Sequence, residues 1–210
     1  MVPFQIATGT MFHAQNLFIA LETDEGLTGL GECSAFPMIA GETQSTCFEM
    51  AKDFAALWKN KDALDIEERL ADLDRFTAFN YTAKSAFDMA LYDLAAKKSG
   101  LPLYKFLNGS QKPIETDLTI GIGDPEIMAA TVADFKKKGV RIIKIKLGKN
   151  GNEDIRRVQM IRSAVGDSIK LRVDANQGWD FDTAKNVLHD IADYDIEFCA
   201  GSCGLLQVIK

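Results

Sequence analysis

The chain has 210 residues, of which 47% are hydrophobic and 26% are charged, and its formal net charge is −6 at pH 7. This length fits one large domain or two small ones, and the composition is ordinary for a globular protein. The negative charge argues against nucleic acid and against an anionic membrane surface as partners, and no apolar run approaches the roughly 20 residues of a membrane span.

The four cysteines, Cys33, Cys47, Cys199 and Cys203, are scattered along the chain, and no histidine spacing completes a zinc site. The N-terminal residues lack the charged and apolar regions of a signal peptide. We therefore expect a cytoplasmic protein with reduced thiols.

Residues 11–33 predict a β-hairpin, because apolar side chains alternate with others on both arms and residues 23–26 read Thr-Asp-Glu-Gly, a turn. Three helices are predicted next, at residues 46–59, 65–76 and 81–99, from apolar residues at helical spacing. Asp65 is placed to cap the second helix. Asp88 and Asp93 lie in the apolar third helix, and we interpret both as structural.

Pro113 marks the start of a second region, in which strands and helices alternate. The predicted strands are residues 114–122, 141–147, 171–176 and 195–199. The predicted helices are residues 125–138, 152–165 and 180–191. Asn152 is expected to cap the second of these helices, and Asp180 or Asp182 to open the third. Neighbouring strands in such an order are parallel, with right-handed crossovers. Each strand has one apolar face, and charge appears on the other as the strand ends. That pattern suits a (β/α) barrel, whose polar residues gather at the carboxyl ends of its strands.

Lys144 and Lys146 lie two residues apart on one predicted strand, so they share a face at a separation of about 7 Å. Two unit charges at that distance repel by roughly 2 kcal/mol at an effective dielectric of about 20, which favours a neutral amine able to accept a proton. Asp174, where the next strand ends, offers an oxygen to a hard cation such as Mg²⁺. A Lys-x-Lys pair alone is typical of a solvated strand, and Asp-x-Asn of a turn. At matching strand ends, they together predict a site.

The motifs Lys144-Ile-Lys146 and Asp174-Ala-Asn176 resemble the enolase superfamily, specifically its muconate-lactonising branch. Residues 22–32 and the segment AKSAFDMALYDLAAKKSGLPLYKFLNG also resemble that branch. The resemblance implies an α+β capping domain over residues 1–112 and the first part of a (β/α) TIM-type barrel, strands one to about four, over residues 113–199. Loops around residues 1–11 and 36–42 would close over the barrel mouth.

Carried over by position, the resemblance implies that Lys146 is the proton-transfer base, with Lys144 beside it, and that Asp174 is the first of three carboxylate ligands to Mg²⁺. Asn176 would support the site, and Thr119 would contact substrate. The implied reaction is Mg²⁺-dependent removal of the proton next to a carboxylate, through an ene-diolate, as in enolase-superfamily sites. The implied ligand is a small carboxylate or a dipeptide.

Within the branch, dipeptide epimerases of the L-Ala-D/L-Glu type resemble the chain most, through Thr119 and the segments KIKLG and TIGIGDPE. o-Succinylbenzoate synthase, N-acylamino acid racemase and muconate cycloisomerase share the same half-site and stay open. A function of another class also stays open, namely a non-catalytic remnant or a self-associating half-barrel that forms a homo-oligomer, because unpaired strand edges invite pairing.

The resemblance stops after Cys199. The family continues with Glu-Gln-Pro, whose glutamate is the second metal ligand, whereas residues 200–210 read AGSCGLLQVIK and are expected to form a tail unlike the family. Glu197 lies three residues early, and on a regular strand it points to the other face. Since a TIM barrel alone takes about 250 residues, we expect a truncated chain that binds Mg²⁺ weakly and is inactive by itself.

Overall fold

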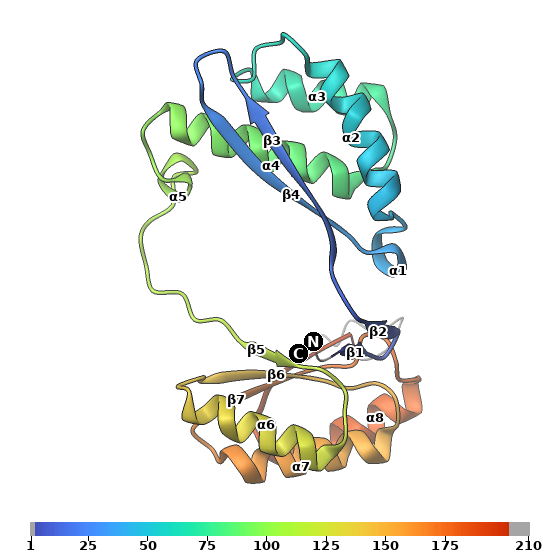
Figure 1. Cartoon of the computed structure of the whole chain (residues 1–210). Coiled ribbons are helices and arrows are strands. Elements are labelled where there is room, and N and C mark those ends of the chain that lie inside the picture. The colour runs from blue at the N-terminus through green and yellow to red at the C-terminus, as the bar shows by residue number, and fades with distance from the viewer. Residues whose placement is uncertain (1–2, 202–210) are drawn as a thin grey trace. The chain divides into compact units, whose positions relative to one another are not determined.

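A computed structural model describes residues 3–201, which form two compact units (Figure 1). One unit is His13–Pro113, and the other joins the described residues up to Phe12 to those from Ile114 onward. The first residues of the chain thus group with its second half, whereas the sequence assigned them to the capping domain. Cys203 and most of the predicted tail lie outside the described residues. Within residues 3–201, no helix is both long and apolar enough to cross a membrane.

The unit His13–Pro113 is built on an antiparallel hairpin of β3 (Gln15–Glu22) and β4 (Thr28–Ala35). Its helices are α1 (Pro37–Ala40), α2 (Gln44–Trp58), α3 (Ile66–Phe76), α4 (Tyr81–Lys98) and α5 (Leu103–Phe106). Strand β4 runs so close to α4 that a Cβ at Gly31 would lie 1.8 Å from the carbonyl oxygen of Ala86. Glycine therefore permits this close packing of strand and helix.

Aromatic rings from α2 and α4 fill the centre of this unit. Phe87 meets both Phe54 and Trp58 edge to face, with ring centroids 5.4 and 5.1 Å apart. Asp93 accepts a hydrogen bond from the backbone N–H of Leu30 at 2.8 Å, so it has the structural role expected of it. The side chain of Asp65 makes no capping hydrogen bond, and the prediction of a side-chain cap there is wrong.

The second unit is a four-stranded parallel sheet in the order β5-β6-β7-β8. The strands are β5 (Leu118–Ile120), β6 (Ile142–Lys146), β7 (Lys170–Asp174) and β8 (Ile196–Ala200). Helices α6 (Pro125–Lys137), α7 (Gly151–Val165) and α8 (Phe181–Asp190) cover one face of the sheet (Figure 1), and a short 3-10 helix spans Ala192–Tyr194. The expected fold class, an α+β capping domain followed by part of a (β/α) barrel, is confirmed.

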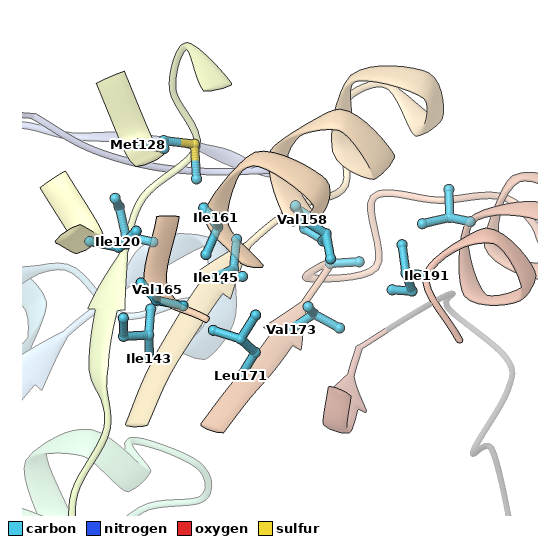
Figure 2. Close-up of a cluster of buried hydrophobic side chains, with 14 of the residues drawn as sticks. Ile120, Met128, Ile143, Ile145, Val158, Ile161, Val165, Leu171, Val173 and Ile191 are labelled. Carbon is cyan, nitrogen blue, oxygen red and sulfur yellow. The ribbon is translucent and has the colours of Figure 1, made fainter. Parts of the chain in front are cut away.

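One face of this sheet is apolar and packs against helix α7 (Figure 2). The sheet contributes Ile143, Ile145, Leu171 and Val173, and the helix contributes Val158, Ile161 and Val165, all of them fully buried. Because side chains alternate along a strand, the residues between these point to the opposite face. The burial of the isoleucines on β6 therefore places both lysines of that strand on the face away from the helices.

Several local predictions differ from the structure. Strand β5 is three residues long, whereas residues 114–122 were expected, because only these three pair with β6. The cap of α7 is Asn150 and not Asn152, since the Asn150 side chain accepts from the N–H of Glu153 at 3.1 Å. Residues 1–11 were expected to be a loop, but β1 (Phe4–Ile6) and β2 (Gly9–Met11) form an antiparallel pair.

Candidate active site

Two lysines and one aspartate meet where β6 and β7 end. The Nζ of Lys146 donates to Oδ2 of Asp174 at 2.8 Å, and the Nζ of Lys144 lies 2.9 Å from the same oxygen. The register of the parallel strands explains this meeting, because Lys146 lies directly opposite Asp174. The side chains are 25% exposed at Lys144, 11% at Lys146 and 9% at Asp174, so the cluster is mostly shielded from solvent.

The carboxylate of Asp174 neutralises only part of the positive charge of the two lysines. Burial raises the pKa of Asp174, but the ammonium groups of Lys146 and Lys144 and the N–H of Asn176 lower it, and the net shift is below the ordinary value. The repulsion expected between the two lysines is offset by the carboxylate that they share. Asp174 is therefore an anion held between two cations.

Asn176 and Thr119 complete the set of residues predicted from the sequence. The backbone N–H of Asn176 donates to Oδ1 of Asp174 at 3.0 Å, and its side-chain oxygen is buried with no partner among the described residues. Asn176 has φ +47°, in the left-handed region that asparagine tolerates better than most residues. Thr119 lies opposite Lys144 in the register of β5 and β6, so both share the charged face. The register thus puts Thr119, Lys144, Lys146 and Asp174 on one face of the sheet, and Asn176 follows the end of β7 and meets Asp174 through its backbone.

The expected orientation of Glu197 is wrong. Strand β8 is irregular here, because Leu171 lies opposite Ile196 whereas Arg172 lies opposite Phe198, so Glu197 is an extra residue on its strand. Its carboxylate turns to the charged face and accepts from Nε of Arg172 at 2.5 Å.

Arg172 forms a second group of charged contacts on the same face of β7, two residues before Asp174. Its Nη1 also donates to Asp117 at 2.9 Å, and its guanidinium lies 5.0 Å from the ring centroid of Phe198. These contacts, first to Glu197 and then to Asp117, raise the pKa of Arg172 above its ordinary value. The sequence pattern did not reveal this group of contacts, because Asp117 and Glu197 lie 55 and 25 residues away from Arg172 in the chain.

The described residues do not by themselves form a magnesium site. Within residues 3–201, no group of three or more histidine, cysteine, aspartate or glutamate side chains could hold a metal ion. Asp174 contributes one carboxylate, already engaged by two ammonium groups, whereas Mg²⁺ prefers six oxygen ligands in an octahedron. Glu197, three residues before the position at which the family would carry its second ligand, is engaged by Arg172.

Cys199 lies on β8 beside the cluster, opposite Val173. Burial, and then the negative charge of Asp174, raise the pKa of its thiol to about 11. A thiol with that pKa is almost wholly protonated near pH 7, so Cys199 is not suited to be a nucleophile.

Two family models match this chain. Residues 1–108 match the mandelate racemase / muconate lactonizing enzyme N-terminal domain, and residues 127–199 match the enolase C-terminal domain-like family. The chain belongs to the mandelate racemase / muconate lactonizing enzyme family. The predicted resemblance to this branch is therefore confirmed.

Members of the family similar to this chain include dipeptide epimerases. The D-Ala-D/L-Ala epimerase of Cytophaga hutchinsonii is 44% identical over 198 residues, which cover 94% of this chain and 54% of that protein. The hydrophobic dipeptide epimerase of Enterococcus faecalis is 40% identical over 194 residues, 92% of this chain and 55% of that protein. The chain spans about half the length of these curated relatives.

Solved structures of the family have a fold similar to that of this chain. A dipeptide epimerase from Cytophaga hutchinsonii, crystallised with Mg and the dipeptide D-Ala-L-Val, matches with a TM-score of 0.93 and 42% identity, covering 97% of this chain and 55% of that one. A muconate lactonizing enzyme crystallised with muconolactone matches with a TM-score of 0.92 and 27% identity, covering 99% of this chain and 57% of that one.

Proposed function

We propose that this chain carries part of the active site of a dipeptide epimerase, in which Lys146 removes the proton next to a carboxylate. Lys144 lies beside the base, Asp174 is the first carboxylate ligand to Mg²⁺, Asn176 supports the site, and Thr119 contacts substrate. The observation that carries this proposal is the convergence of both lysines on Asp174 at the carboxyl end of the sheet. The similarity to dipeptide epimerases supports the choice of substrate class.

The geometry sets a condition for the base. A lysine that accepts a proton must first be neutral, yet Lys146 donates a hydrogen bond to Asp174 at 2.8 Å and is its salt-bridge partner. The ion pair must therefore open before Lys146 can act. Lys144, one-quarter exposed, keeps a positive charge near the place where a substrate carboxylate would bind. Negative charge that develops on the substrate during proton removal would be stabilised by that ammonium group.

Epimerisation needs a proton donor on the opposite side of the substrate carbon, and both proposed lysines lie on the same strand and the same face of the sheet. We therefore expect no epimerisation by the 210-residue chain in the presence of Mg²⁺ and a dipeptide. The assay is proton NMR in D₂O, which reports both inversion and deuterium incorporation at the α-carbon. Rapid Mg²⁺-dependent inversion by the purified chain would contradict this expectation.

A fusion tests the assignment of roles. Residues 1–199 would be joined to the remaining half of the Cytophaga hutchinsonii epimerase, to which the chain is 44% identical. We expect this fusion to epimerise dipeptides. Lys146→Met should lower kcat at least about 1,000-fold, because it removes the base, whereas Lys137→Met, at a 77% exposed side chain, is the matched control. An active Lys146→Met fusion would refute the assignment of the base.

A second candidate function is self-association. In the sheet of the described residues, β5 and β8 each pair with one neighbour, and unpaired strand edges favour pairing with another chain. Sedimentation velocity at several concentrations tests it: a single monomeric species at 100 μM, a concentration on the order of those at which weak association is visible, would exclude it.

A further inference from the structure

The buried carboxylate of Asp154 lies outside the cluster of Lys144, Lys146 and Asp174, near the start of helix α7. Its side chain is 0% exposed, and isolated buried charges are costly unless fully hydrogen-bonded. Oδ2 accepts from the N–H of Gly148 and from Nε1 of Trp179, both at 2.8 Å, and Oδ1 accepts from Nη1 of Arg157 at 2.7 Å. All of these donors belong to the same unit.

These bonds tie together loops that follow three different strands. Gly148 comes two residues after Lys146, at the end of β6, and Trp179 comes five residues after Asp174, at the end of β7. Arg157, 5% exposed, extends the network to a third strand, because its Nε donates to the carbonyl oxygen of Gly123, just beyond β5, at 2.9 Å. Its Nη2 donates to Glu153 at 2.8 Å.

Direct backbone packing makes these loops depend on each other. Gly148 has φ +108°, and a Cβ there would lie 2.2 Å from the carbonyl oxygen of Ala175. A Cβ at Gly178 would likewise lie 2.2 Å from the carbonyl oxygen of Gly148. The two loops are thus in contact through their backbones, and a shift of one must move the other.

We propose that Asp154, together with Arg157, is a positioning residue that holds the ends of β6 and β7 so that Lys146 and Asp174 stay within hydrogen-bonding distance. Its importance for catalysis rests on the proposed function, but the coupling itself does not. The side-chain bonds of Asp154 and the bond of Arg157 to Gly123 all lie at the carboxyl end of the sheet, where the cluster lies. Loss of these bonds should therefore loosen the strand ends that carry Lys146 and Asp174.

The same helix offers a matched control at the other end of the sheet. Arg162 is also buried, at 7% exposure. It donates to the carbonyl oxygens of Gly166, Ile169, Tyr194 and Asp195, which precede β7 and β8. Loss of Arg162 should therefore weaken the unit without disturbing the ends of the strands that carry the cluster.

The experiment compares Asp154→Asn with Arg162→Lys in the full chain by two NMR readouts. The first is hydrogen exchange at the Gly148 amide, which should become about tenfold faster or more in Asp154→Asn, because its hydrogen bond then has at best a neutral acceptor in place of a carboxylate. The second is the ¹⁵N signal of the Lys146 ammonium group, which is observable when an ion pair slows its exchange with water. We expect it to weaken several-fold in Asp154→Asn and to persist in Arg162→Lys.

The proposal is overturned if Asp154→Asn leaves both readouts unchanged, or if Arg162→Lys changes them equally, since Asp154 would then be merely structural. Should Asp154→Asn not fold, Trp179→Phe decides, because it removes only the indole donor. The same two changes are then expected with smaller amplitude, and their absence overturns the proposal. Neither readout depends on Mg²⁺ or on turnover. The experiment therefore tests the role of Asp154 even if the chain turns out not to be part of a dipeptide epimerase.

Discussion

Replacement of Asp174 by asparagine tests the charge balance at the centre of the site. The substitution keeps the shape of the side chain and can keep the bond from the N–H of Asn176, but it removes the anion between Lys144 and Lys146. The bond to the nearly buried Lys146 contributes about 1.5–3 kcal/mol, as for hydrogen bonds to charged groups. The bond to Lys144, one-quarter exposed, contributes up to about 1 kcal/mol. We expect Asp174→Asn to lower the free energy of unfolding by about 1.5–4 kcal/mol at pH 7.

The loss should depend on pH in a defined direction. The folded-state pKa of Asp174 lies below the ordinary value of about 3.9. Its stabilising contribution is therefore complete above that ordinary value and is lost as the pH falls through the lower folded-state pKa. The difference in stability between the two proteins should stay constant from pH 7 to about pH 5 and narrow below about pH 4.

Urea unfolding monitored by tryptophan fluorescence measures both effects. The chain has two tryptophans, so a Trp58→Phe background leaves Trp179 as the reporter of the unit that contains the site. Asp134→Asn is the matched control, because it removes the same charge from an exposed pair with Lys137, whose loss should leave the free energy of unfolding nearly unchanged. An Asp174→Asn protein as stable as the parent at pH 7, or a difference unchanged down to pH 2.5, a value well below the ordinary pKa of about 3.9, would refute the reasoning.

Three further predictions concern the thiol, the capping unit and the metal. The thiol of Cys199 has a pKa raised to about 11, so iodoacetamide at pH 8 should modify it roughly a hundredfold more slowly than an unperturbed cysteine. Peptide mass spectrometry measures the two rates. Equal rates would contradict the inference that burial raises the pKa of this thiol. Gly31→Ala should lower the free energy of unfolding of the unit His13–Pro113 by about 2 kcal/mol or more, since its Cβ would lie 1.8 Å from the carbonyl oxygen of Ala86. Thermal unfolding measures this loss. An unchanged midpoint would show that β4 can move away from α4 at little cost in free energy. Isothermal titration calorimetry should give a Kd for Mg²⁺ weaker than about 1 mM, because one carboxylate leaves most of the coordination to water. A Kd near 10 μM, roughly a hundredfold tighter than that value, would instead show that the chain supplies further ligands.

The local pattern of the sequence was sufficient to predict the faces of the strands. Ile143 and Ile145 alternate with Lys144 and Lys146, and that period of two decides which side chains can be buried. The same reasoning placed Asp174 at a strand end, and the motifs indicated the family, whose resemblance in turn pointed to Thr119. These features depend on neighbours along the chain and on strand parity, both of which can be read from one sequence.

Only the tertiary structure decided which groups touch. The register of β6 against β7 brings both lysines onto one oxygen of Asp174, whereas the sequence predicted only that the three residues share a site and that the lysines repel each other. The irregularity of β8 turns Glu197 toward Arg172, because one extra residue reverses the parity on which the prediction depended. Asp154 reads as an ordinary acidic residue in the first turn of a helix, yet it meets Trp179, 25 residues away. Such contacts arise from how strands are aligned and packed, and no periodicity within one segment records that alignment.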